Sequence, residues 1–161
     1  MATKTFATFK LGKQLYGVDV MYVREINKQI DITPVPHAPE YIRGLVNLRG
    51  QIVTVMDIIK RLTPDFTTVT DSTCNLIIKT DNELAPIRQR EDRPDLKSVQ
   101  DSVGLLVDEI DEIVTFDDKE ISPPPTNVGK VEGKFMSGVV QLPEGLLVIL
   151  SIEKVLQHNQ N

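Results

Sequence analysis

Residues that most often carry catalysis or bind metals are scarce in this sequence. Its 161 residues include one cysteine, two histidines and no tryptophan, and aromatic residues make up 5% of the chain. The single cysteine, Cys74, excludes an internal disulfide and a cysteine-built zinc site. With so few aromatic side chains, the core has to be built from valine, isoleucine and leucine.

Long apolar runs and basic clusters are also missing. No segment reaches the ~18 apolar residues of a membrane span, and the first residues lead into Phe6 without the apolar stretch of a secretory signal. We therefore expect a cytoplasmic protein. The net charge is −5, which argues against nucleic-acid binding because affinity for phosphates depends on clustered lysine and arginine.

Short β-rich segments dominate the chain, and no long helical pattern separates one from the next, so we predict an all-β fold with short helices. The segments span residues 6–11, 15–20, 43–48, 51–57, 73–79, 103–107, 110–116, 135–142 and 146–150. A short C-terminal helix is predicted over 151–158, with Ser151 as its N-cap. Residues 21–26 fit either a helical turn or a strand.

An internal repeat is the most informative feature of the sequence. Tyr41–Leu48 matches Phe135–Leu142, with Gly44 aligned to Gly138. The other matches keep the same order along the chain: Gly17-Val18 with Gly104-Leu105, 23–26 with 110–113, 32–36 with 121–125, and 55–58 with 149–152. We interpret this pattern as a duplication whose copies differ by short loop insertions.

Each copy has about five short strands, which is the size of a small β-barrel. Such a barrel has a thin core, so we expect the two copies to pack together and leave a groove where they meet. Within a single domain of residues 1–161, subdomain one is predicted at about 12–66. Subdomain two is predicted at about 73–151, possibly with 4–11.

Residues 81–102 lie outside the repeat and are strongly polar and charged. They are too long for a hairpin turn, so we predict a protruding or mobile loop. It is either a solvated insertion or a contact with a specific partner.

Two groups of polar residues are candidates for catalysis. Asp108, Glu109, Asp111 and Glu112 form a dense acidic run, but no cationic or nucleophilic partner lies near them in the sequence. A solvated acidic edge is therefore favoured over a catalytic pair. His37 lies between prolines in an extended loop, without an orienting carboxylate. We predict no enzymatic activity, no metal site and no cofactor.

Residues 47–50 have the composition of a hairpin turn. Asn47 and Gly50 tolerate positive φ, whereas Arg49 is not explained by turn chemistry. If residues 23–26 are extended, Val23 and Glu25 share one face. A mixed apolar and anionic face suits recognition, although an ordinary amphipathic strand has the same pattern.

Nearly the whole chain, about residues 4–157, resembles the CheW family of chemotaxis coupling proteins. The matching motifs are Tyr16-Gly-Val-Asp-Val20, 23–26, Thr33-Pro-Val-Pro-His-Ala-Pro-Glu-Tyr-Ile-Arg-Gly44, 47–51, Gly104-Leu-Leu-Val-Asp108, 121–125, Phe135-Met-Ser-Gly138 and 146–156. The resemblance implies two five-stranded, SH3-like barrels. It also implies a non-enzymatic adaptor without a cofactor, which couples chemoreceptors to the histidine kinase CheA.

The resemblance also implies sites and a location. Receptor contacts fall on Val23, Glu25, Gly44, Arg49 and Gly50, with the helical receptor tip against the groove between the barrels. Contacts with the regulatory domain of CheA fall on Gly138, Asn47 and the apolar barrel ends. The expected location is cytoplasmic, in receptor arrays next to the inner membrane, with membrane contact only through the receptors.

Three alternative functions stay open at this point. The first alternative is a CheW-like adaptor of a non-flagellar array that controls pili or development, because the loop at 81–102 departs from the family pattern. A small-barrel nucleic-acid-binding module and a hydrolase based on the acidic run are less favoured.

Overall fold

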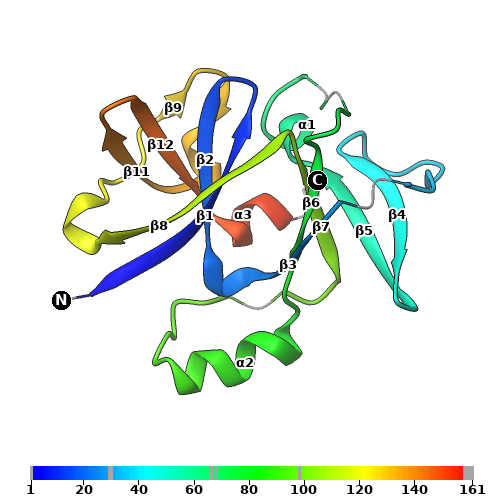
Figure 1. The fold of residues 1–161 in the computed structure, drawn as a ribbon, viewed down its shortest axis with the longest axis horizontal. Helices are drawn as coiled ribbons and strands as arrows, with labels where there is room; N and C mark the ends of the chain where they lie inside the picture. The colour runs from blue at the N-terminus through cyan, green and yellow to red at the C-terminus, as the bar shows by residue number, and fades with distance from the viewer. Residues whose placement is uncertain (1, 29–30, 66, 68, 98, 158–161) are drawn as a thin grey trace.

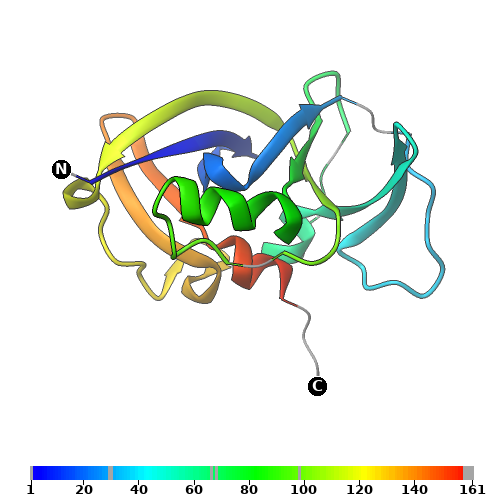
Figure 2. The same cartoon turned by 90° about the horizontal axis from the view of Figure 1, so that it is seen from below.

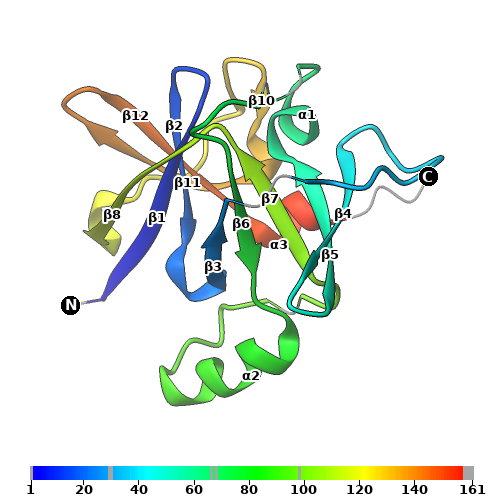
Figure 3. The ribbon, with the colours of Figure 1, turned by 45° about the vertical axis from the view of Figure 1, so that its right-hand side comes forward.

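The computed structural model describes residues 2–28, 31–65, 67, 69–97 and 99–157. One sheet, called sheet A, contains β1 (Thr3–Leu11), β2 (Gln14–Asp19), β8 (Glu109–Asp117), β11 (Met136–Leu142) and β12 (Gly145–Leu150). Sheet B contains β3 (Val23–Asn27), β4 (Ile42–Leu48), β5 (Gln51–Asp57), β6 (Cys74–Ile78) and β7 (Val103–Val107). Both sheets are strongly curved (Figures 1 and 3). This agrees with the predicted pair of five-stranded, SH3-like barrels.

Short elements connect and cover the two sheets. Strands β9 (Asn127–Val128) and β10 (Val131–Glu132) form a separate small hairpin. The helices are α1 (Ile58–Leu62), α2 (Asp81–Arg90) and α3 (Ile152–Leu156), and the 3₁₀ turns are η1 (Val20–Tyr22), η2 (Asp118–Glu120) and η3 (Gly133–Phe135). No helix in the described part of the chain combines the length and the apolarity that crossing a membrane requires.

The duplication is visible in the strand order. Sheet A runs β11-β12-β2-β1-β8 and sheet B runs β4-β5-β7-β6-β3. The pairs β12–β2 and β5–β7 are parallel, and the other pairs in both sheets are antiparallel. The series β1, β2, β3, β4, β5 therefore corresponds to β6, β7, β8, β11, β12. Each copy gives its first two strands to one sheet and its last three to the other.

This exchange corrects the predicted subdomain boundaries. The range 12–66 includes β2, which belongs to sheet A, and the range 73–151 includes β6 and β7, which belong to sheet B. Residues 4–11 lie in sheet A with β8, β11 and β12. The chain passes from β2 through the short turn η1 directly into the other sheet. No linker marks the crossing, so sequence composition does not reveal it.

The largest hydrophobic cluster lies between the two sheets and is called the shared core. It contains Phe9 and Val18 of sheet A together with Leu105 and Val107 of sheet B. Leu106, between the last two, points instead into a smaller core inside sheet B. Successive residues of a strand face opposite sides, so central strands with a core on each side are apolar throughout. The expected packing of the two copies against each other is confirmed.

The predicted loop at 81–102 is wrong, because residues 81–90 form helix α2. Leu84 and Ile87 of this helix, with Leu96 and Val99 beyond it, are buried in the shared core. In the view from below, α2 lies in front of the junction between the sheets (Figure 2). The helix begins with a capping box, in which Thr80 and Glu83 satisfy each other's backbone N–H groups.

The predicted C-terminal helix is confirmed over Ile152–Leu156. The side chain of Ser151 caps it by accepting a hydrogen bond from Lys154 N. Its counterpart in the first copy is Asp57, which caps α1 by accepting from Lys60 N. The open question at residues 21–26 is also resolved, since η1 ends at Tyr22 and β3 follows.

Replacing Leu84 with alanine tests whether α2 is part of the core. We expect Leu84→Ala to lower the free energy of unfolding by about 2–4 kcal/mol, because it removes a fully buried side chain and leaves a cavity. Urea denaturation measures this loss. Gln89→Ala, at an exposed position of the same helix, should change stability by no more than about 0.5 kcal/mol. Equal, small effects of both substitutions would show that α2 does not complete the core.

Candidate functional site

Several of the residues assigned by resemblance gather where the two opposite edges of sheet B approach each other. Strand β3 is an edge strand that pairs only with β6, and the opposite edge of the sheet is the β4–β5 hairpin. Arg49 at the hairpin tip forms an ion pair with Glu25 of β3. The contact joins residues 24 positions apart in the sequence. We call Arg24, Glu25, Arg49, Gly50 and Gln51 the edge patch.

The conformation of the hairpin tip is fixed by its own residues. Arg49 and Gly50 have φ values of +52° and +87°, as a two-residue turn of the I′ type requires at both central positions. The side chain of Asn47 accepts a hydrogen bond of 2.9 Å from Gly50 N. The hairpin predicted at 47–50 is confirmed. It holds the Arg49 side chain 70% exposed, so the guanidinium remains accessible while it pairs with Glu25.

Apolar side chains accompany the charged pair. Val23 is half-buried and packs against the shared core, whereas Ile26, next to Glu25, is 44% exposed. Ile52, next to Gln51, is 54% exposed. Single exposed aliphatic side chains are common on protein surfaces. Ile26 and Ile52 each follow a residue of the edge patch along a strand, where successive side chains face opposite sides of the sheet.

The two matched glycines have an internal role. A Cβ atom at Gly44 would lie 2.1 Å from the carbonyl oxygen of Thr33, and one at Gly138 would lie 2.9 Å from that of Ser122. Both carbonyls belong to equivalent bridges, Thr33 with Leu45 and Ser122 with Val139. The close backbone approach expected at Gly44 is thus made by the same chain, and both glycines are buried.

Helix α2 braces the edge patch, and sequence reasoning missed this contribution. Arg24 Nε donates to both carboxylate oxygens of Glu83, at 2.9 and 3.1 Å, and Arg24 Nη1 donates to Gln51 Oε1 at 3.0 Å. Gln51 Nε2 in turn donates to Ser102 Oγ at 2.8 Å. This chain of contacts links α2, β3 and the hairpin. The spacing of Thr80 and Glu83 is the one sequence signal that indicates a helix start here.

The Glu83 carboxyl group is tuned by opposing effects. Its burial acts to raise its pKa, but hydrogen bonds from Arg24 and from Thr80 N outweigh the burial, and the pKa lies below its ordinary value of 4.5. A carboxyl group whose pKa is lowered by folding stabilises the folded state above its unfolded pKa. That contribution is lost as the pH falls through the lower, folded-state pKa.

The pH dependence of stability tests this bridge. We expect Glu83→Gln to lower the melting temperature at pH 7, and the difference from the unmodified protein to shrink as the pH falls below about 4.5. Thermal unfolding followed by circular dichroism from pH 7 to pH 3 measures both quantities. Glu91→Gln removes the same charge at an exposed position of the C-cap and serves as the control. A Glu83→Gln difference that stays constant across this range would contradict the ion pair.

Gly44 offers a second stability test. At a φ of +145°, and with Thr33 O so close to any Cβ, Gly44→Ala should cost about 2–4 kcal/mol of unfolding free energy, from backbone strain and overpacking together. Gly129 has a φ of +57° and open space around it, so Gly129→Ala should cost only about 1 kcal/mol. Urea denaturation compares the two. Similar losses would show that the Thr33 contact is not what requires glycine at position 44.

The candidates for catalysis do not assemble into a reactive site. Asp108 accepts a hydrogen bond from Gly12 N, and the side chains of Glu109 and Glu112 are exposed on β8. The Cys74 thiol is buried, and burial raises its pKa, which disfavours the thiolate. These residues, as far as the structure describes their surroundings, do not bring a nucleophile and a base together.

The fold defines a class of protein: a double-barrel module of two five-stranded sheets, which carries an exposed charged patch on its surface. The CheW-like domain model matches residues 5–160. The chain therefore belongs to the CheW-like domain family.

Relatives and a solved structure agree with this assignment. The chain is 31% identical to the chemotaxis protein CheW of Rhizobium meliloti, over 91% of this chain and 83% of that protein. It is 29% identical to the CheW protein of Treponema pallidum, over 95% of this chain and 82% of that protein. The crystal structure of the scaffolding protein TtCheW from Thermoanaerobacter tengcongensis superposes with a TM-score of 0.79 at 26% identity, covering 100% of this chain and 92% of that one.

Proposed function

We propose that this protein is a non-enzymatic adaptor that couples the cytoplasmic tips of transmembrane chemoreceptors to the histidine kinase CheA in chemotaxis. The observation that carries the proposal is the meeting of Glu25 and Arg49 at the exposed edge of sheet B. These two positions are assigned to receptor binding by resemblance, and Glu25 comes from β3 whereas Arg49 comes from the turn between β4 and β5. The family assignment supports the same role.

The receptor tip binds at the edge patch. The Glu25–Arg49 pair is largely exposed on the arginine side, and such pairs contribute little to stability, about 0–1 kcal/mol. A partner can therefore redirect either charge at low cost. The partner also contacts Ile26 and Ile52, which are exposed one position along the chain from Glu25 and Gln51, because helical partners combine aliphatic anchors with a charged rim. Val23 and Gly50 support this surface from the strand and the hairpin.

The regulatory domain of CheA binds at the apolar barrel ends, and at Asn47 its site adjoins the edge patch. Asn47 is exposed on the β4–β5 hairpin, whereas Gly138 acts through the shape of the backbone between β11 and residue 122. A body with one barrel at each end can contact the kinase and the receptor at the same time. The adaptor then resides on the cytoplasmic side of the inner membrane, within receptor arrays, without touching lipid.

The alternatives have less support. The related proteins carry the name chemotaxis protein, which favours chemotaxis over arrays that control pili or development. The net charge of −5 disfavours nucleic-acid binding. A hydrolase based on the acidic run lacks an activated nucleophile.

Charge reversal at Arg49 tests the receptor site. We expect Arg49→Glu to weaken binding to a receptor cytoplasmic fragment that contains the tip by about tenfold or more, because like charges then face each other in the contact. Binding to the regulatory domain of CheA should weaken less, since most of that contact lies on the apolar barrel ends and does not involve the Arg49 charge. Isothermal titration calorimetry with each partner measures both. Equal losses for the two partners would contradict the assignment.

A charge swap separates a direct contact from an internal one. The double variant Arg49→Glu with Glu25→Arg restores an ion pair within the edge patch but reverses both charges toward a partner. We expect receptor binding to stay weak in this variant. Recovery of normal affinity would show that the pair only stabilises the hairpin and does not touch the receptor. Lys119→Glu, which makes the same charge change as the single variant Arg49→Glu at an exposed position of η2 beside sheet A, is the matched control for that single variant.

A further inference from the structure

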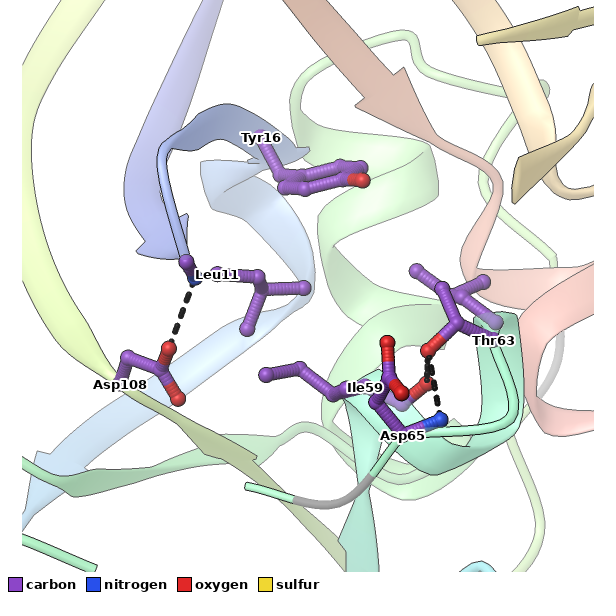
Figure 4. A pocket seen from close by; sticks show the side chains of 8 residues that line it. Leu11, Tyr16, Ile59, Thr63, Asp65 and Asp108 are labelled. Carbon is purple, nitrogen blue, oxygen red and sulfur yellow. Dashed lines mark hydrogen bonds between the residues drawn. The ribbon is translucent and has the colours of Figure 1, made fainter. Parts of the chain in front are cut away.

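The two copies of the repeat differ most in length at one connection. Strands β1 and β2 are joined by residues 12–13, whereas the equivalent strands β6 and β7 are joined by residues 79–102, which contain α2. The short turn is fixed to the residue before β8 by a hydrogen bond of 2.8 Å from Gly12 N to Asp108 Oδ2 (Figure 4). It therefore shows how this fold closes without an inserted helix. We call residues 79–97 the α2 segment.

The α2 segment holds both ends of the crossover from sheet A to sheet B, residues 19–24. At the first end, Arg93 forms an ion pair with Asp19, the N-cap of η1. The side chains of Arg93 and Asp19 are only 16% and 13% exposed, so solvent screens this pair less than one at the surface. At the other end, Glu83 accepts the hydrogen bonds from Arg24 Nε described above. Ion pairs thus fasten one segment to both ends of the crossover.

Tyr22 ties the middle of the crossover to the same segment. Lys79 N donates a hydrogen bond of 2.7 Å to the Tyr22 carbonyl oxygen, and Lys97 N donates one of 2.8 Å to the Tyr22 hydroxyl oxygen. The Tyr22 side chain is buried, and in the view from below the crossover lies behind α2 (Figure 2). Both ends of the α2 segment are therefore bonded to one residue between the two sheets.

Strand β3, which follows the crossover, contains a β-bulge at Arg24. Val23 and Glu25 pair with adjacent residues of β6, so Arg24 is the extra residue on β3. The equivalent strand β8 has an extra residue at the matching place, within 110–113, so the bulge belongs to the duplicated fold. Bulges change the direction of the side chains beside them. Because Glu83 holds Arg24, the α2 segment influences the direction of Glu25.

Completion of the core does not account for these polar contacts. Leu84 and Ile87 bury one side of α2, and that burial by itself favours the docked helix. Partly exposed ion pairs add little stability, but a bidentate pairing of arginine with a carboxylate fixes the relative orientation of the two groups. Glu83 and Arg93 are therefore better suited to positioning the crossover than to stabilising the fold.

We propose that the α2 segment positions Glu25 for contact with the receptor, with Glu83 and Arg93 as positioning residues. Arg93 fixes the start of the crossover and Glu83 fixes the bulge. Glu25 is then held where it meets Arg49 at the hairpin tip. Strand β3 depends on this support because it is an edge strand, and segments with few neighbours open locally at low cost. The naming of the receptor rests on the proposed function, whereas the positioning of Glu25 does not.

Hydrogen exchange tests the hold on the crossover without a partner. The amides of Lys79 and Lys97 report on the crossover, and the amide of Val148 in the central strand β12 reports on global unfolding. In Arg93→Gln, we expect the exchange rates of the first two to rise about tenfold more than the rate of the third. Arg90→Gln, at an exposed position of α2, is the matched control and should change each rate less than about twofold. An equal rise at all these amides in Arg93→Gln would show that Arg93 serves general stability only, which would overturn its positioning role.

Contacts between the Glu25 and Arg49 side chains test the direction of β3. Their protons should give nuclear Overhauser effects in the unmodified protein, and we expect these signals to weaken in Arg93→Gln and in Glu83→Gln but not in Arg90→Gln. A small loss of global stability does not move this readout, because nearly all molecules stay folded. Unchanged signals in both Arg93→Gln and Glu83→Gln would overturn the proposal.

Receptor binding connects this positioning to function. We expect Arg93→Gln, which lies outside the edge patch, to weaken binding of the receptor fragment about threefold to tenfold, and Arg90→Gln to leave it within about twofold, as measured by isothermal titration calorimetry. Unchanged affinity in Arg93→Gln, with normal binding by the unmodified protein, would overturn the role in receptor contact. If the receptor fragment does not bind the unmodified protein, the proposed function fails, while the exchange and Overhauser measurements still decide whether the α2 segment positions Glu25.

Discussion

Neither barrel of this protein can be completed by its own half of the chain. Each sheet takes two strands from one copy of the repeat and three from the other, and the largest hydrophobic cluster lies between the sheets. Burial of apolar area is the main source of folding free energy, and a barrel of five short strands has little of it alone. The two barrels therefore fold and unfold as one unit, and every surface site described above depends on that unit.

The shared core also explains why the functional candidates lie where they do. The central strands β6 and β7 are buried on both faces, so they have no side chains to offer to a partner. Accessible side chains are left at the edges of the sheets, in the hairpin tips and along the seam. The edge patch occupies the first two of these places. Helix α2 connects the core to the edge patch, because Leu84 and Glu83, adjacent in sequence, face the core and Arg24 respectively.

Much of the fold is predictable from the sequence, since periodicity and the match of Gly44 with Gly138 report local structure and duplication. The strand exchange cannot be predicted in this way. The apolar pattern of a strand indicates that both of its faces are buried, but it does not indicate which strands lie beside it. Helix α2 escaped prediction for a different reason. Its sequence is strongly charged and contains Pro86, so its two buried side chains do not stand out. Only the capping pair Thr80 and Glu83 marks its start.

The candidate site was predictable to a lesser degree. Resemblance pointed to Glu25 and Arg49, yet nothing local indicates that these residues touch, because their contact depends on the path of the whole sheet. For Gly44, the sequence suggested a contact with a partner that the structure explains within the chain. A glycine in a recognition motif suggests a close approach by a partner, but the carbonyl of Thr33 in the same chain makes that approach.

The parallel pairing of β2 with β12 has a consequence for how the protein is made. Gln14, near the start of the chain, donates a hydrogen bond to the backbone of Leu146, 132 residues later. At a synthesis rate of about 5–20 residues per second, the first hairpin waits roughly 7–26 s on the ribosome before its neighbouring strand exists. During that time its open side is exposed to any nascent or finished chain nearby. The rate at which the second half of the chain is translated, and the binding of chaperones to the first half during that time, therefore affect the fraction of chains in which the first hairpin reaches its native pairing.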